Sequence, residues 1–248
     1  MSKFSILSPR VGSADVWPIG TAASLSSSIS MTQQGRHCLF CHRTGTSREH
    51  ILADWIGRSL TGPPLPGITI RFTHESTMPD GTPLRAKSAA STAYYTRAFC
   101  RECNGGWMSR LEDAVKPILE PMLHGRPWTT LSVEDQRLLA FWATKTAFAF
   151  QTQEGAETTW ARPQQFEALY AEQGPLPGSQ VWLGAREQFH AAWYRSHSLR
   201  LPGAPEDQVD GFGAALSLGF AVFWLIVPDN PNVQVRLVSE AAMMMKPI

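Results

Sequence analysis

Cys38-Leu-Phe-Cys41 and Cys100-Arg-Glu-Cys103-Asn104 enclose the stretch that decides the fold, and Ser47-Arg-Glu-His-Ile51 lies between them. These two CxxC pairs contain all four cysteines of the chain. Four thiolates satisfy a tetrahedral Zn²⁺ ion and leave no position open for a substrate. We therefore predict a closed, structural zinc site formed by Cys38, Cys41, Cys100 and Cys103.

Two other uses of the cysteines fit the sequence less well. In a secreted chain they could form disulfides, but residues 1–35 show no compact apolar segment behind a basic start. Neither pair has the strand–helix context of a thioredoxin-like redox site. We expect metal-bound thiolates in a reducing, cytoplasmic setting.

The composition is that of a folded protein. Of 248 residues, 43% are hydrophobic and 10% are aromatic, which is enough for a sizeable core. The net charge of +1 gives no overall basic field, although a local basic face would still be compatible with nucleic acid. Residues 1–35 are rich in Ser, Ala and Gly and are predicted to form a disordered tail, unless Met31 is the true start.

Between the cysteine pairs we expect a short helix or turn followed by a hairpin. Ser47 is a plausible N-cap for the first element, which would end near residues 57–62. Alternating apolar residues predict strands at 68–72 and 92–99, which would pair beneath the site. Pro79-Asp-Gly81 predicts a turn between them.

A helix is expected from Trp107 onward. Met108, Leu111 and Val115 fall on one face at helical spacing, so we assign that face to the core. Pro117 should break or kink the helix.

The remainder of the chain predicts an α+β region with an antiparallel sheet. Ser132 and Asp135 resemble a capping box at the start of a long, buried helix, and residues 162–173 predict a more amphipathic one. Strand-like runs follow at 180–185, 189–201, 214–227 and 233–238.

Residues 211–227 carry no charge and could be taken for a membrane span. The run is shorter than the roughly 20 apolar residues that a membrane helix needs, and its flanks are Asp210 and Asp229 rather than basic anchors. Buried strands that meet at a bend near Gly219 are the better interpretation.

Glu49 and His50 carry the chemistry that we expect of the stretch. A neutral imidazole can take the proton of an attacking water, because its pKa lies near neutrality. A carboxylate can hold a divalent cation that neutralises a phosphate. A Glu-His pair alone is a weak signal, but its place between two halves of a zinc site, with Asn104 after the last cysteine, makes it more specific.

The pattern of Cys38-x2-Cys41, Glu49-His50-Ile51 and Cys100-x2-Cys103-Asn104 resembles the zinc-knuckle branch of the HNH endonuclease family. The resemblance covers residues 36–120 and implies a ββα-metal fold, in which a β-hairpin and a helix clasp one catalytic metal. It implies that His50 is the general base and that Glu49 and Asn104 bind Mg²⁺ or Mn²⁺. The four cysteines would hold the structural Zn²⁺.

The chain departs from the family pattern in two places. The family's middle Asn, which pins the loop that carries the base, is missing ahead of Cys100, and Thr92 or Thr96 would have to replace it through a hydroxyl. The His or Lys that often follows the final Asn is also missing. Glu112 could supply a further carboxylate, but we favour a solvated helix acid.

The resulting prediction is a metal-dependent endonuclease that hydrolyses nucleic acid, and the resemblance favours DNA over RNA as the substrate. Residues 36–125 would form the nuclease domain, and residues 126–248 would bind the target, a partner protein or a second copy. Arg48 and Arg101, which adjoin the motifs, are expected to contact phosphates. The alternative is a zinc-stabilised binding module for nucleic acid or protein whose catalytic site has decayed. No membrane association is expected.

Overall fold

The structure is a computed structural model. It describes residues 37–61, 72–77, 83–89, 94–126, 130–153, 160–201, 203–205, 208–233 and 245–247. The expected tail at residues 1–35, the turn at Pro79–Gly81 and nearly all of the expected strand at 233–238 lie outside the described residues.

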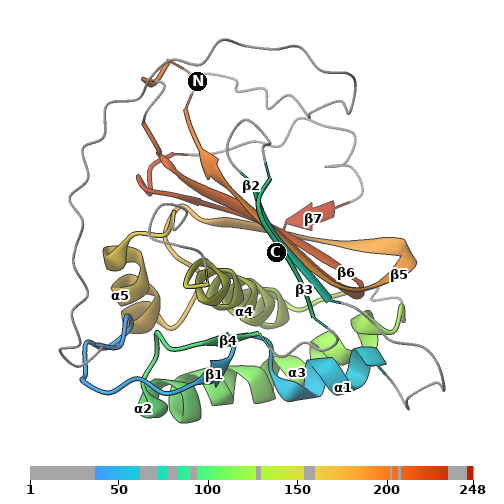
Figure 1. The fold of residues 1–248 in the computed structure, drawn as a ribbon. Coiled ribbons are helices and arrows are strands. Elements are labelled where there is room, and N and C mark those ends of the chain that lie inside the picture. Colours follow the sequence, from blue (N-terminus) through green and yellow to red (C-terminus); the bar gives the residue numbers. More distant parts are fainter. Residues whose placement is uncertain are drawn as a thin grey trace.

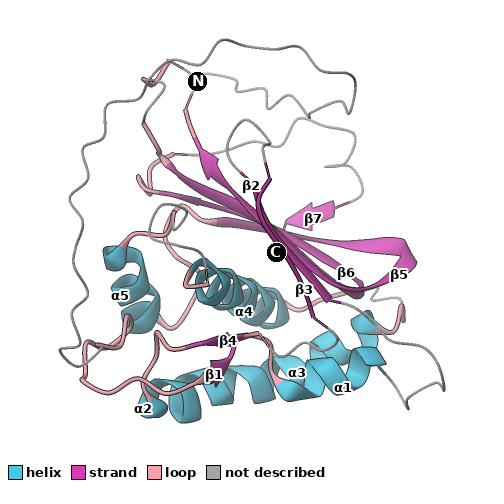
Figure 2. Cartoon of the chain, viewed as in Figure 1, coloured by secondary structure: helices cyan, strands magenta, loops and turns pink. Residues whose placement is uncertain are grey.

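The chain folds into layers of mixed α and β structure, with one long helix in the middle (Figure 1, Figure 2). A sheet forms one outer layer, α4 and α5 lie beneath it, and the other helices lie on the far side of α4 with the ladder of β1 and β4. The bounds of these elements are β1 (Glu49–His50), α1 (Asp54–Thr61), β4 (Tyr95–Thr96), α2 (Arg101–Cys103), α3 (Ser109–Leu123), α4 (Val133–Gln151) and α5 (Pro163–Glu172).

The sheet has five strands, with the order β3-β2-β5-β6 and with β7 paired to β5. The long strands β5 (Gln180–Leu199) and β6 (Gly211–Pro228) are antiparallel, as predicted for this region. β2 (Phe72–Thr77) runs antiparallel to β3 (Pro83–Ala89) but parallel to β5, and β7 (Met245–Pro247) is antiparallel to β5. Strands from between the cysteine pairs thus extend the C-terminal sheet.

The expected pairing of the 68–72 and 92–99 segments is wrong. Phe72 belongs to β2 and pairs with Ala89 of β3. The ladder near the cysteines joins β1 to β4 instead, with Glu49 opposite Thr96 and His50 opposite Tyr95. The short β4 offers few pairing groups, so the longer β2 finds its partners in β3 and β5.

The helix expected after Ser47 is present but begins later than predicted. Glu49 and His50 form the strand β1, and the helix α1 begins at Asp54 and ends at Thr61, within the predicted range of 57–62. Ser47 is therefore not an N-cap. Its backbone N–H donates to Phe99 O over 2.9 Å, which places it in the same ladder.

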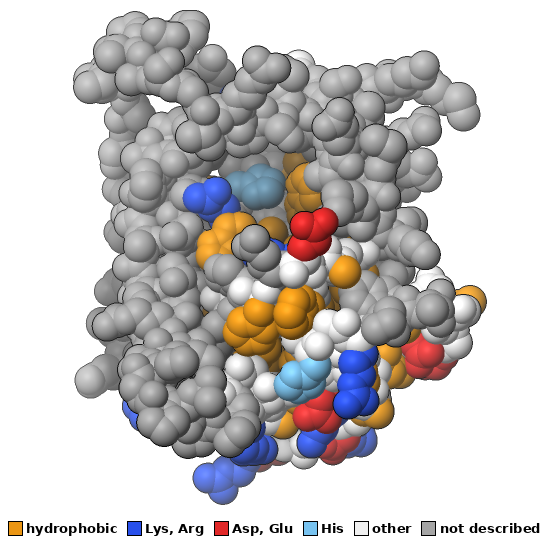
Figure 3. All heavy atoms as spheres, turned by 90° about the vertical axis from the view of Figure 1, so that its right-hand side faces the viewer, with side chains coloured by type: hydrophobic (Ala, Val, Ile, Leu, Met, Phe, Trp, Pro, Cys, Tyr) orange, Lys and Arg blue, Asp and Glu red, His pale blue; other side chains and the backbone are white. Residues whose placement is uncertain are grey.

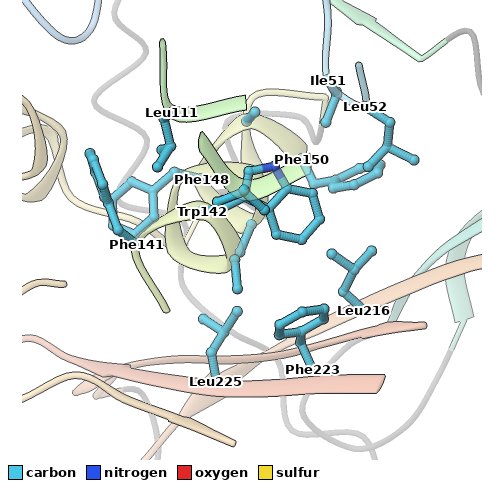
Figure 4. Close-up of a cluster of buried hydrophobic side chains, with 14 of the residues drawn as sticks. Ile51, Leu52, Leu111, Phe141, Trp142, Phe148, Phe150, Leu216, Phe223 and Leu225 are labelled. Carbon is cyan, nitrogen blue, oxygen red and sulfur yellow. The ribbon is translucent and has the colours of Figure 1, made fainter. Parts of the chain in front are cut away.

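The helix α4 forms the centre of the core. Ser132 and Asp135 form the predicted capping box, with Asp135 N–H donating to Ser132 Oγ over 3.0 Å. Every residue from Leu139 to Gln151 is buried, as expected for a helix with protein on all sides. Figure 4 shows Leu216, Phe223 and Leu225 of the sheet on one side of α4 and Leu111, Ile51 and Leu52 on the other.

Two further predictions concern α3 and β6. Met108, Leu111 and Val115 are buried as predicted, but Pro117 does not break the helix, which continues through Pro121 to Leu123. The 211–227 run is the strand β6, and its bend falls at Gly219, which has a φ of +57°. Within the described residues, no helix is long and apolar enough to cross a membrane.

Candidate functional site

The four cysteines come together in a single cluster. All four Sγ atoms lie within 4.8 Å of one another, and no disulfide joins them. Cys38 Sγ lies 3.8 Å from Cys103 Sγ, and Cys41 Sγ lies 3.5 Å from Cys100 Sγ. A tetrahedron with Zn–S bonds of about 2.3 Å has S–S edges of about 3.8 Å. The cluster therefore has the donors and the size to hold a metal ion such as zinc.

Two short turns place the cysteines. In the first, His42 N–H donates to Cys38 O over 2.9 Å, and His42 adopts a left-handed backbone with a φ of 58°. In the second, Cys103 N–H donates to Cys100 Sγ over 3.4 Å. Leu39 N–H donates to Ala98 O over 3.0 Å and ties the two turns together.

Burial also raises the pKa of two of the four thiols. It raises the pKa of Cys100 to about 11 and raises the pKa of Cys103 further, so both thiols hold their protons at neutral pH when no metal is bound. A metal ion must displace these protons in order to bind.

Glu49 and Asn104 meet beside the cluster. The Glu49 carboxylate is buried and accepts hydrogen bonds from Ser47 Oγ at Oε1 and from Asn104 Nδ2 at Oε2. Each carboxylate oxygen keeps a second lone pair, and the Asn104 amide keeps its Oδ1. Oxygen donors of this kind are the ligands that Mg²⁺ and Mn²⁺ prefer. Within the described residues, however, the cysteines form the one group of three or more His, Cys, Asp or Glu side chains close enough to hold a metal ion.

Asn104 lies beside a kink in the helix. It begins η1 (Asn104–Met108), the segment between α2 and α3, in which Gly106 has the non-helical angles φ −99° and ψ −108°. Gly tolerates such backbone angles, so the kink falls at a residue that can adopt it.

His50 is held from two sides. Its Nε2 lies 3.2 Å from Asp54 Oδ1, and its ring packs on Tyr95 with 4.3 Å between centroids. The His50 side chain is 36% exposed, so the imidazole can reach solvent. In the tautomer that donates Nε2–H to Asp54, Nδ1 keeps the lone pair that can accept a proton.

Glu112 is not the solvated acid that we favoured from the sequence. Its side chain is 13% exposed, and Oε1 accepts from Lys145 Nζ over 2.5 Å. Lys145 comes from α4 and is 2% exposed. The ion pair therefore joins α3 to α4.

These groups line a single cleft of about 350 Å³. Its walls include the expected site residues Glu49, His50 and Asn104, together with Asp54, Glu112, Asp113 and Lys145. The lining holds four carboxylates against one ammonium, so the cleft favours a cation before an anion can enter.

The two predicted arginines have different positions. The Arg48 guanidinium lies over the Tyr95 ring at 3.7 Å, so it shares that ring with His50. Arg101 is exposed at the start of α2 and does not line the cleft. Their predicted contacts with phosphate stay predictions.

Backbone hydrogen bonds fix the loop that carries His50. Thr96 Oγ1 contacts Thr152 Oγ1 at 2.6 Å and so does not reach the His50 loop, and Thr92 lies outside the described residues. Ile51 N–H donates to Tyr94 O over 2.8 Å, and this bond with the β1–β4 ladder fixes the loop.

Asp54, Asp113 and Lys145 are the charged cleft residues that sequence reasoning missed. A signal existed for two of them: Asp54 stands four residues after His50, and Lys145 is the one charged residue between Leu138 and Phe150. A single charged residue in an apolar helical run is expected to form an ion pair, because burial of an unpaired charge costs free energy.

Comparison with protein-family models, with curated proteins and with solved structures finds no match to this chain.

Proposed function

We propose that this protein is a metal-dependent endonuclease of the HNH type, which hydrolyses phosphodiester bonds of nucleic acid, with DNA as the first substrate to test. The observation that carries the proposal is the convergence of Glu49, Asn104 and His50 on one cleft beside the cysteine cluster. The strand β1, which carries the acid and the histidine, pairs antiparallel with β4, and α2 follows β4 in the chain. This pairing supports a ββα arrangement, although α1, β2 and β3 lie between the two strands in the sequence.

In this proposal Zn²⁺ is structural and a second cation is catalytic. The four thiolates close the zinc coordination and leave nothing for a substrate. Glu49 and Asn104 would hold Mg²⁺ or Mn²⁺, which supplies charge for the phosphate and the leaving oxygen. Buried Glu49 keeps its orientation through its contacts with Ser47 and Asn104.

His50 would act as the general base. It takes a proton from water as the water oxygen bonds to phosphorus, and the bond from phosphorus to the leaving oxygen breaks. The leaving oxygen then takes a proton from solvent. Asp54 keeps the imidazole in one tautomer and stabilises the imidazolium that forms.

The binding-module alternative differs in what the cleft does. A decayed site would keep the cysteine cluster and lose the reacting groups, whereas here Glu49, His50 and Asn104 all line the same cleft. We therefore place hydrolysis first.

The experiment is cleavage of supercoiled plasmid with Mg²⁺ or Mn²⁺ by the parent protein and by His50→Ala. We expect nicked or linear product from the parent only, and no product in EDTA. Equal cleavage by the two proteins would exclude His50 as the base. If the parent protein binds nucleic acid but does not cleave it, the result would support the binding module.

A further inference from the structure

Lys145 is a buried cation at the edge of the cleft, and it comes from a different part of the chain than the other cleft residues. It stands on α4, whereas Glu49, His50 and Asn104 belong to the stretch around the cysteines. Among the described residues that line the cleft, it is the one Lys or Arg. A charged side chain that is 2% exposed needs a physical reason for its place.

The Glu112–Lys145 pair is incompletely hydrogen-bonded. An ammonium has three N–H donors, and the described residues give Lys145 one acceptor, Glu112 Oε1. Glu112 Oε2 is buried and has no hydrogen-bond partner among the described residues. Most buried polar atoms are satisfied, so spare donors beside a cleft point to an acceptor that arrives with a ligand.

The chemistry of that ligand follows from the donors. An ammonium repels a metal ion and donates to oxygen, so its partner is an anion or a neutral acceptor. The four cleft carboxylates exclude a bare anion until a cation has been bound. A phosphate group that enters with a divalent cation meets both conditions.

We propose that Lys145 binds a phosphate oxygen of the substrate and that Glu112 is the positioning residue that holds the ammonium in place. The identity of the substrate as nucleic acid rests on the proposed function, but the binding of a phosphate by Lys145 does not require cleavage. Through Lys145, the helix that supports the sheet would contribute directly to the cleft.

The test measures DNA binding in a background that cannot cleave. His50→Ala protein is compared with the same protein that also carries Lys145→Met, Glu112→Gln, or both changes. Lys116→Met is the matched control, because Lys116 is partly buried on α3 and does not line the cleft. The probe is a fluorescein-labelled DNA duplex with Ca²⁺, read by fluorescence anisotropy over a series of salt concentrations.

The expected effects have opposite signs. Lys145→Met and the double variant should bind at least about 10-fold more weakly, because a charge-assisted hydrogen bond is lost. The slope of the logarithm of their binding constant against the logarithm of the salt concentration should become shallower by about the amount that one phosphate contact contributes. Glu112→Gln should bind as tightly or more tightly, since the amide Oε1 can still accept from the ammonium and hold it in place, while one negative charge that repels phosphate is removed. Lys116→Met should stay within about twofold.

A purely structural role predicts a different pattern. If Lys145→Met and Glu112→Gln weaken binding equally, or if the double variant binds like the Lys116→Met control, the proposal is wrong. The double variant leaves no buried charge unpaired, so weaker binding by this variant cannot be attributed to misfolding caused by such a charge. Circular dichroism checks that it is folded. If the parent protein never cleaves but the opposite signs appear, the nuclease proposal fails and the Lys145 site stands.

Discussion

At the scale of single residues, the contact between His50 and Asp54 makes a direct prediction about rate. Asp54→Asn should lower the cleavage rate about 10–100-fold, because the imidazole loses the carboxylate that orients it. Asp54 is 62% exposed, so the fold should be unaffected. Asp113→Asn is the control, since Asp113 is an exposed acid that lines the same cleft. Equal losses from both changes would show that the cleft needs only total negative charge.

Glu112 and Lys145 make a prediction about stability. Removing either partner alone leaves a buried charge unpaired, so Lys145→Met or Glu112→Gln should lower the free energy of unfolding by roughly 3–5 kcal/mol. Replacing both should cost much less than the sum of the two losses. Urea denaturation of the parent, the two single variants and the double variant measures this coupling. Additive losses would mean that the two side chains do not interact.

Sequence reasoning identified only part of the site at this scale. Glu49, His50 and Asn104 belong to the pattern that resembles the HNH family, and that resemblance implied that they converge. Lys145 follows Asn104 by 41 residues, and its partner Glu112 lies on another helix. A contact between two helices depends on how they pack, which the pattern of one helix does not contain.

At the scale of elements, the cysteine cluster is expected to hold β1, β4 and α2 together. Removing the proposed Zn²⁺ with a chelator should lower the melting temperature, and Co²⁺ in its place should give thiolate-to-metal absorption bands. Cys103→Ser should lower the melting temperature and reduce the intensity of the Co²⁺ absorption bands. A melting temperature that does not change when the chelator is added would contradict a structural role for the metal.

The pKa values of the thiols give the sign of the pH effect. Because Cys100, with a pKa of about 11, and Cys103 bind protons more tightly than ordinary thiols, zinc binding must release protons. Zinc affinity should therefore fall as the pH falls. Calorimetry in two buffers of different ionisation enthalpy counts the released protons. Equal heats in both buffers would show that no protons are released.

The bend of β6 makes a third prediction at this scale. Gly219 and Gly203 both have a left-handed backbone, so alanine costs about 1–2 kcal/mol at either position. Only at Gly219 would the new Cβ meet another atom, since Leu123 O would lie 2.1 Å away, whereas Gly203 has no atom within 4 Å. Gly219→Ala should therefore cost about 1–3 kcal/mol more than Gly203→Ala in urea denaturation. Equal costs would show that the bend does not need this close approach.

Local patterns predicted the helices better than the strand pairing. The capping box at Ser132 and the buried α4 depend on neighbours along the chain, and both were predicted. The pairing of β2 with β5 joins residues more than 100 positions apart, such as Thr73 and Trp193. Period-two alternation shows that a segment is a strand but does not name its partner.

At the scale of the whole molecule, α4 connects the cleft with the sheet. On one side, Phe141 stacks on Trp107 with 5.5 Å between ring centroids. On the other, Trp142 packs on Phe223 of β6 at 5.6 Å. Residues 72–77 add a strand to the same sheet. The expected boundary near residue 125 stays a prediction, and contacts of α4 with both layers favour a cooperative unit.

The described side chains on the face drawn in Figure 3 form no basic patch for nucleic acid. Figure 3 shows that acidic and basic side chains are intermixed along the lower edge of one face, rather than gathered into a basic patch. This agrees with the net charge of +1. The nucleic-acid binding that we propose should then depend on the proposed divalent cation and on a few local cations, of which Lys145 is the one that lines the cleft among the described residues.

The shared helix predicts that the cleft and the sheet unfold together. Phe223→Ala, far along the chain from the cysteines, should lower the free energy of unfolding by roughly 3–5 kcal/mol. A Co²⁺ ion at the cysteine cluster reports the unfolding of the cleft layer, and far-ultraviolet circular dichroism reports the whole chain. We expect both signals to shift to the same lower urea concentration in Phe223→Ala. A different result would be a Co²⁺ signal with an unchanged urea midpoint while the midpoint of the dichroism signal falls. That result would show that the region around the cysteines folds independently, because its stability would then not depend on its packing against α4.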